Sequence, residues 1–137
     1  MTTQRSEILI RAPLERVREI LLKPLEFPEW NPAFTALAGP TNPAEGDPYA
    51  LTIRNGLSGS LTYEHIDARL VAVRWSTIGF RESATWSLEP SGESTRVVHE
   101  FEHEGGLARL LRQAFRTVAQ QRNERLAQRA EAPPIVR

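Results

Sequence analysis

Apolar and polar residues alternate through much of residues 49–104, and this period of two constrains the fold more than any other feature of the chain. Successive side chains of a β-strand point to opposite faces of a sheet, so the alternation predicts strands with one apolar face. Turn sequences such as Asn55-Gly56 separate the runs, which is typical of an antiparallel meander. The alternating residues of the first three runs are Tyr49, Leu51, Ile53, Leu61, Tyr63, His65, Val71, Val73 and Trp75.

Residues 80–89 and 94–104 form the clearest hairpin in the sequence. We expect a turn centred on Ser91-Gly92, which fixes how the two strands pair. The predicted pairs are Trp86 with Val97 and Ala84 with His99. The residues expected on the apolar face are Glu82, Ala84, Trp86, Leu88, Val97, His99, Phe101 and His103.

The segment before the meander is predicted to contain a strand and two short helices. A short apolar strand over residues 5–11 precedes a helix that holds Pro13 in its first turn and stops at Pro24. A second helix or turn is expected over 25–30, and the glycine and proline of residues 38–48 predict a loop. The apolar stripe of the first helix consists of Leu14, Val17, Ile20 and Leu21.

The segment after Gly105-Gly106 changes from a period of two to the spacing of a helix. This helix is expected to run from Leu107 to about Ala130, ~35 Å at the standard rise. Its stripe contains Leu107, Leu110, Leu111, Ala114 and Val118, with Phe115 on the flank.

Polar residues continue the stripe of this helix where apolar ones would be expected: Gln121, Arg122 and Arg125. They are expected to stay in water, or Arg122 or Arg125 meets a carboxylate on a ligand.

The composition excludes several classes of protein. The 137 residues carry 17 basic and 17 acidic side chains, so no net charge favours nucleic acid or an anionic membrane. The absence of cysteine excludes disulfides, thiolate nucleophiles and cysteine-bound metals. No segment has the length and apolarity of a membrane span, so we expect no integral membrane association and, by default, a cytoplasmic location.

The order of these elements, with four local strings, resembles the START-like or Bet v 1-like superfamily (SRPBCC), in its polyketide cyclase-like or chaperone-activator-like branch. The strings are IRAPLERV, FPEWNP, EGDPYALTI and WSLEPSGESTRVVHEFEHEGG. The resemblance implies an α+β helix-grip fold, in which a curved seven-stranded antiparallel sheet wraps around the long C-terminal helix. It implies one domain over residues 1–131 and a ligand cavity between sheet and helix. It does not imply a reaction. The two prolines in residues 132–137 predict a flexible tail after the domain.

A strongly curved sheet cannot contact a straight helix along its whole length, so the space between them is either filled by large side chains or hollow. Both alternatives use the same aromatic residues. Polar residues on the inward faces would anchor a ligand, and a His–Glu pair among them could orient it or move a proton. Alternatively, Glu82, His65 and His103 reach water near strand ends, and His99 is a core histidine whose hydrogen bonds are satisfied. The candidate ligand-binding residues are Trp30, Tyr63, His65, Trp75, Glu82, Trp86, His99, Phe101, Phe115 and Val118.

No metal or cofactor is expected. His99 and His103 are four residues apart on a predicted strand, ~13 Å, and cannot bind one ion together.

The leading hypothesis is a protein that binds a small hydrophobic molecule, such as a lipid, a polyketide or an isoprenoid-like compound, as a monomer or weak homodimer. One alternative is a cyclase or dehydratase with His65, His99 or Glu82 as acid or base. Another is a chaperone-cofactor-like interaction module with a solid interior.

Overall fold

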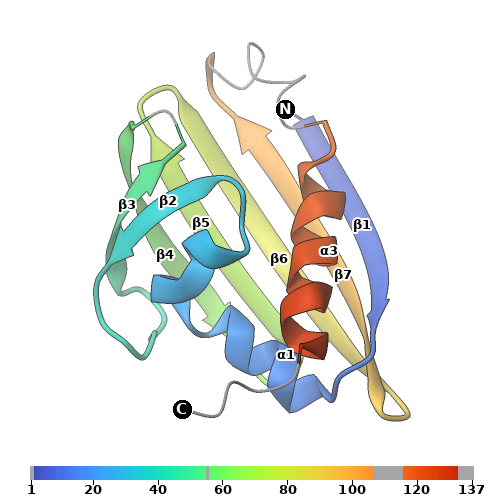
Figure 1. The fold of residues 1–137 in the computed structure, drawn as a ribbon. Coiled ribbons are helices and arrows are strands. Elements are labelled where there is room, and N and C mark those ends of the chain that lie inside the picture. Colours follow the sequence, from blue (N-terminus) through green and yellow to red (C-terminus); the bar gives the residue numbers. More distant parts are fainter. Residues whose placement is uncertain (1, 55, 107–115, 133–137) are drawn as a thin grey trace.

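The chain forms one antiparallel sheet of seven strands with helices on its concave side (Figure 1). The computed structural model describes residues 2–54, 56–106 and 116–132. The strand order is β1-β7-β6-β5-β4-β3-β2, so β1 and β2 are the two edges. The elements are β1 (Thr2–Ile10), α1 (Leu14–Leu21), η1 (Pro24–Glu29), β2 (Phe34–Ala38), β3 (Pro48–Ile53), β4 (Ser58–Ile66), β5 (Leu70–Thr77), β6 (Phe80–Ser91), β7 (Ser94–Glu104) and α3 (Val118–Glu131).

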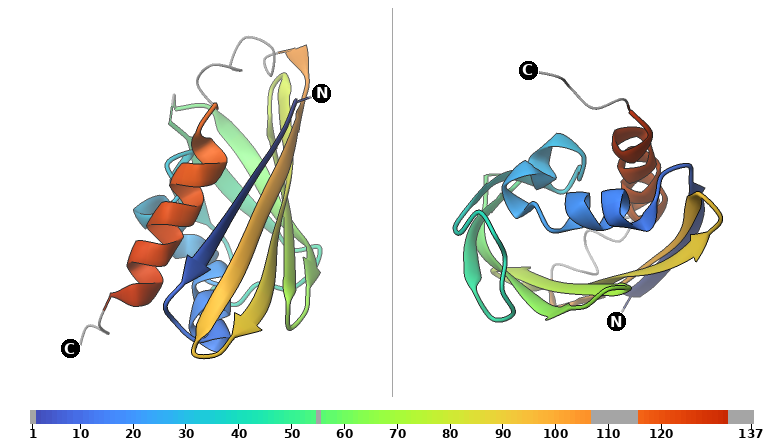
Figure 2. Two further views of the ribbon diagram at one scale, coloured as in Figure 1. Left: turned by 90° about the vertical axis from the view of Figure 1, so that its right-hand side faces the viewer. Right: turned by 90° about the horizontal axis from the view of Figure 1, so that it is seen from below.

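The sheet curves around its helices, as the view from below in Figure 2 shows. Helix α3 packs against β1, β7 and α1, while the 3-10 helix η1 packs against β2. The α+β helix-grip architecture predicted from the sequence is confirmed.

Helix α1 follows the sequence prediction closely. Pro13 is its N-cap residue, and Pro24 begins the next helical segment, so the chain cannot continue α1 beyond that point. The inward side of α1 buries Val17, Ile20 and Leu21, three of the four residues of the predicted stripe. These side chains close one end of the space enclosed by the sheet.

Strand β2 is absent from the pattern-based prediction, which assigns no strand to residues 34–38. Only Phe34 of its five residues is buried, so the strand shows no period of two. A register shift between Phe34 and Ala36 further disturbs the alternation.

The β6–β7 hairpin turns at Gly92-Glu93, and the predicted register was wrong by two residues. Gly92 has φ 63°, which suits the first central position of a two-residue hairpin turn. Because the shift is two, each side chain keeps its predicted face. The observed pairs are Trp86 with His99 and Ala84 with Phe101, instead of Trp86 with Val97 and Ala84 with His99.

A β-bulge in β4 reverses the predicted direction of His65. The pairing with β5 shifts between Tyr63 and His65, so Glu64 is an extra residue on this strand. Beyond the bulge, His65 faces outward and pairs with Asp67 at 2.6 Å. His65 therefore does not lie with Tyr63 on the inward face.

Helix α3 turns a different face to the sheet than the predicted stripe. It ends at Glu131, close to the predicted Ala130, but it begins only at Val118, after a turn at 116–117, so the predicted unbroken helix is wrong there. The predicted start at Leu107 lies outside the described residues. Gln121 and Arg125 are exposed as expected, but Arg122 is buried, so its expected solvation was wrong. The buried residues of the helix are Val118, Ala119, Arg122, Asn123, Leu126, Ala127 and Ala130.

Candidate functional site

Three neighbouring strands place Trp75, Glu82 and His103 in one row across the inward face of the sheet. Glu82 on β6 lies opposite Trp75 on β5 and opposite His103 on β7. All three side chains are buried, so the alternative in which Glu82 and His103 reach water near strand ends is wrong. Glu82 is the third residue of β6 and His103 the last but one of β7, yet both lie under the helix.

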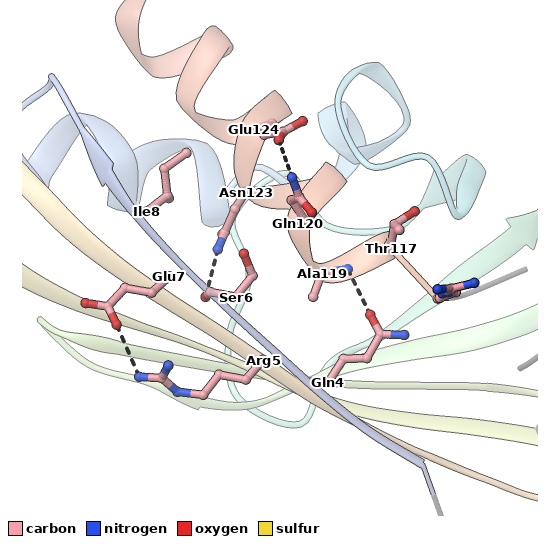
Figure 3. Close-up of a pocket in the computed structure, with 11 residues that line it drawn as sticks. Gln4, Arg5, Ser6, Glu7, Ile8, Thr117, Ala119, Gln120, Asn123 and Glu124 are labelled. Atoms are coloured by element: carbon pink, nitrogen blue, oxygen red, sulfur yellow. Dashed lines mark hydrogen bonds and ion pairs between the residues drawn. The ribbon is translucent and has the colours of Figure 1, made fainter. Parts of the chain in front are cut away.

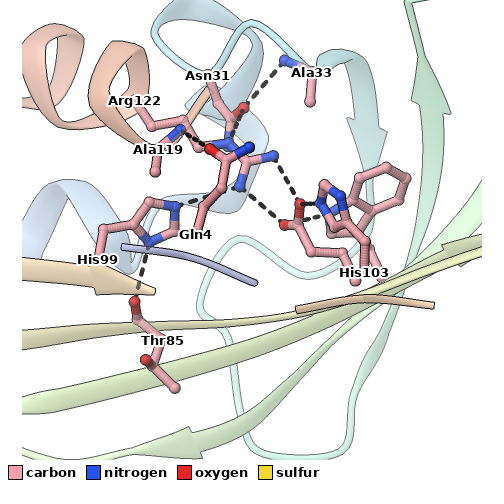
Figure 4. Close-up of polar contacts among 10 residues, drawn as sticks. Gln4, Asn31, Ala33, Thr85, His99, His103, Ala119 and Arg122 are labelled. Carbon is pink, nitrogen blue, oxygen red and sulfur yellow. Dashed lines mark hydrogen bonds and ion pairs between the residues drawn. The ribbon is translucent and has the colours of Figure 1, made fainter. Parts of the chain in front are cut away.

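Arg122 of α3 reaches down to this row and binds the carboxylate of Glu82 through two parallel hydrogen bonds (Figure 4). The distances are 3.0 Å from Nη1 to Oε2 and 3.1 Å from Nη2 to Oε1. Nε2 of His103 lies 2.7 Å from Oε1, and Nε1 of Trp75 donates to Oε2 at 2.7 Å. Four hydrogen bonds thus converge on one carboxylate, which is close to its full capacity.

Two further side chains complete the contacts of the Arg122 guanidinium. Nε of Arg122 donates to Oδ1 of Asn31 at 3.2 Å, and Nη1 lies 3.3 Å from Nε2 of His99. Nδ1 of His99 lies 3.0 Å from the carbonyl oxygen of Thr85 and must carry a proton to donate there. The ring is therefore the neutral tautomer whose Nε2 accepts from Arg122. We call Asn31, Trp75, Glu82, His99, His103 and Arg122 the buried polar cluster.

The electrostatics of the cluster hold Glu82 charged and His99 neutral. Burial by itself raises the pKa of the Glu82 carboxyl, but the charge of Arg122 and the hydrogen bonds from His103 and Arg122 outweigh burial and lower it. Burial and the positive charge of Arg122 lower the pKa of His99 to about 3. Because both groups already use their polar atoms within the protein, the arrangement favours anchoring α3 over proton transfer to a substrate.

The aromatic candidates form a continuous layer on the inward side. Trp30 meets Trp86 edge-to-face with ring centroids 6.2 Å apart, and Phe27 lies 6.4 Å from Tyr63. Trp86 stacks on His99 at 4.1 Å, and Arg122 lies over Phe101 at 5.0 Å. Such a layer can line a pocket or fill it, and both alternatives were predicted for these residues.

The structure brings together most of the predicted site residues. Trp30, Tyr63, Trp75, Glu82, Trp86, His99, Phe101 and Val118 are buried under the helices, His65 is on the outside, and Phe115 lies outside the described residues. Sequence patterns did not identify Asn31, although it sits in the FPEWNP string beside Trp30. They placed Arg122 on the helix but not with Glu82, because the pairing joins residues that are 40 positions apart.

In the part of the chain that the structure describes, three buried donor groups near the cluster have no hydrogen-bond partner. They are Nε1 of Trp30, Nδ2 of Asn31 and Nε1 of Trp86. Asn123 on α3 has an unpaired buried oxygen as well, Oδ1. Such atoms are uncommon in protein interiors, and each calls for an explanation.

A groove of about 460 Å³ runs between β1 and α3 (Figure 3). Asn123 crosses one end of it, where Nδ2 donates to the carbonyl oxygen of Ser6 at 2.9 Å. Oε1 of Gln4 accepts from the backbone of Ala119 at 3.3 Å. The groove therefore borders the same turns of α3 that carry Arg122. A second surface pocket lies at the other end of β1, beside Pro13 and Gly92.

Comparison with known proteins gives this fold a family. The sequence family described as "Polyketide cyclase / dehydrase and lipid transport" matches residues 1–131. The chain belongs to this family. The family's description joins enzymes and lipid carriers, so it supports a role in ligand binding or cyclisation and leaves the ligand open. No curated protein matches the chain in sequence.

Solved structures agree with the family on the fold. A hypothetical protein of Helicobacter pylori is similar with a TM-score of 0.77 at 11% identity, over 95% of this chain and 88% of that chain. The Zhui aromatase/cyclase of a Streptomyces species matches with a TM-score of 0.75 at 15% identity, over 95% and 93%. A START superfamily protein of Mycobacterium smegmatis matches with a TM-score of 0.74 at 16% identity, over 94% of this chain and 97% of that chain. The START-like resemblance seen in the sequence is confirmed.

The described residues also bear on metal sites and membrane spans. Across residues 2–54, 56–106 and 116–132, no three His, Asp or Glu side chains are grouped closely enough to hold a metal ion. The helices in this part of the chain are all too short or too polar to cross a membrane.

Proposed function

We propose that the protein binds a small, largely apolar molecule, such as a lipid, a polyketide or an isoprenoid-like compound, between the sheet and α3. The observation that carries the proposal is the aromatic layer on the inward face of the sheet, which includes Trp30, Tyr63 and Trp86. Flat rings offer a large apolar contact area with little conformational entropy to lose on binding.

The buried polar cluster supports this proposal by fixing α3 over the layer. The Arg122–Glu82 pair sets how far the helix stands from β6, and Asn123 holds the helix to β1. A helix fixed by polar contacts does not need to fill the whole interface with its own side chains.

Catalysis by Glu82 or His99 has less support than binding. Glu82 accepts hydrogen bonds from Arg122, His103 and Trp75, and His99 uses both ring nitrogens within the protein. A general base needs a free lone pair within reach of the substrate proton. We therefore propose binding without assigning a reaction.

The test is binding of the neutral fluorescent probe N-phenyl-1-naphthylamine, together with mass spectrometry of molecules that co-purify with the protein. We expect the probe to bind the wild type and to bind Trp86→Leu at least tenfold more weakly. His65→Ala is the matched control, because His65 alternates with Tyr63 in the sequence yet faces outward. The proposal fails if no molecule co-purifies and the wild type does not bind the probe.

A further inference from the structure

Three hydrogen-bond donors lie buried and unpaired among side chains that touch one another. They are the indole N–H groups of Trp30 and Trp86 and the amide Nδ2 of Asn31. All three residues are at most 2% exposed. Leaving a buried donor unpaired is destabilising, so three together point to an acceptor that the protein itself does not supply.

A chain of contacts around Arg122 links these three residues. Trp86 stacks on His99, and His99 contacts Nη1 of Arg122 at 3.3 Å. Asn31 accepts from Nε of the same guanidinium at 3.2 Å through Oδ1, which leaves Nδ2 as its unused group. Trp30 precedes Asn31 in the chain and meets the Trp86 ring edge-to-face. The donors thus belong to a single patch between η1, β6 and α3.

The charge balance of the cluster selects the kind of acceptor. The positive charge of Arg122 is already compensated by Glu82 through two hydrogen bonds. An ionised ligand group would then be a buried charge without a partner, which is strongly unfavourable. A neutral oxygen avoids this cost and still accepts from the indole and amide donors.

We infer that Trp30, Asn31 and Trp86 form a polar anchor that binds a neutral carbonyl oxygen of an otherwise apolar ligand. This inference rests on the proposed function, and it narrows the ligand class to ketones, esters or amides with an aromatic or aliphatic body. The Arg122–Glu82 pair orients Asn31 for this contact and does not itself bind the ligand.

Three naphthalene compounds test the anchor, because they share a shape and differ in one group. They are 2-acetylnaphthalene, 2-isopropylnaphthalene, which lacks an acceptor, and 2-naphthoate, which is charged. Calorimetric titration of the full chain should show that 2-acetylnaphthalene binds at least tenfold more tightly than either of the other two. Trp30→Phe and Trp86→Phe keep an aromatic ring and remove one donor each, so each should reduce this preference severalfold. Tyr49→Phe is the matched control, because Tyr49 lies outside the proposed anchor and its hydroxyl already donates to the carbonyl oxygen of Pro40 at 2.6 Å.

The indole N–H resonances supply a readout that a loss of packing would not produce. The protein has three tryptophans, so the ¹H–¹⁵N spectrum contains three indole signals. We expect 2-acetylnaphthalene to shift the signals of Trp30 and Trp86 downfield, while the signal of Trp75 stays in place because its N–H is bound to Glu82.

The outcomes separate the anchor from the proposed function. Equal affinity for 2-acetylnaphthalene and 2-isopropylnaphthalene would overturn the anchor and leave the apolar site standing. Tighter binding of 2-naphthoate would overturn the requirement for a neutral acceptor, and an undiminished preference in both tryptophan variants would place the contact elsewhere. If N-phenyl-1-naphthylamine binds and 2-acetylnaphthalene does not, the anchor alone fails. If neither binds and no molecule co-purifies, both proposals fail.

Discussion

Arg122 on α3 and Glu82 on β6 form a two-pronged ion pair, with N–O distances of 3.0 and 3.1 Å, in which both side chains are buried. A pair in this position resists disruption because neither charge can turn to water. Removing one partner leaves the other uncompensated in the interior, which is the costly case for buried ion pairs.

Glu82→Gln should therefore lower the free energy of unfolding by about 3–5 kcal/mol, measured by urea denaturation. The matched control is Glu64→Gln. Oε1 of Glu64 on β4 lies 3.3 Å from Nε of Arg74 on β5, in an exposed ion pair. That change should cost less than about 1 kcal/mol. A similar loss for both variants would contradict the anchoring role of Glu82.

Stability should fall as the pH decreases from about 6.5 toward 5, because of His99. The pKa of His99 is lowered in the folded protein, so the unfolded chain binds the extra proton in this window and is favoured by acid. Urea midpoints of the wild type should decrease across the window, and His99→Asn should show a weaker decrease.

His65→Ala is the control for this pH dependence. Asp67 raises the pKa of His65, which gives that residue an effect of opposite sign on stability. His65→Ala should thus keep the decrease that His99 causes. An unchanged decrease in His99→Asn would refute the assignment.

Gly92→Ala should destabilise the β6–β7 hairpin by about 1–2 kcal/mol, measured by thermal unfolding. The cost comes from φ 63° alone, because an added Cβ would meet no atom within 4 Å. Glu93→Ala changes the other central residue of the turn, which has no positive φ, and should be nearly neutral. Equal effects at both positions would argue against the observed turn.

Asn123→Ala should loosen α3 from β1. The change removes the bond from Nδ2 to Ser6, and it should cost about 1 kcal/mol and speed hydrogen exchange of the α3 amides. Gln120→Ala alters an exposed residue of the same groove and helix, and should leave the exchange unchanged. Unchanged exchange in Asn123→Ala would show that other contacts hold the helix.

Alternation was enough to predict the faces of most strands, since Tyr49, Val73, Ala84 and Phe101 are buried as expected. It could not predict features that depend on one backbone conformation. The bulge at Glu64 turned His65 outward, and the positive φ of Gly92 moved the hairpin register. Both effects are local in the chain but leave no trace in the period of the sequence.

The polar cluster escaped prediction for a different reason. Sequence patterns placed Glu82 and His99 on the inward face but did not identify Arg122 as the partner of both. The partner, Arg122, is on a helix whose buried face includes Ala119, Asn123 and Leu126 and so differs in phase from the stripe extrapolated from residues 107–114. Charge pairing over a long chain separation is decided by packing, which periodicity does not record.

The bidentate pair also limits where α3 can settle during folding. Sliding the helix by one turn, about 5.4 Å, would move Arg122 away from Glu82. Both charges would then be buried without a partner. Misdocked arrangements are penalised before any aromatic contact is considered. Evolution could therefore exchange the rings facing the interior, and with them the molecule that fits there, without losing the alignment of the helix.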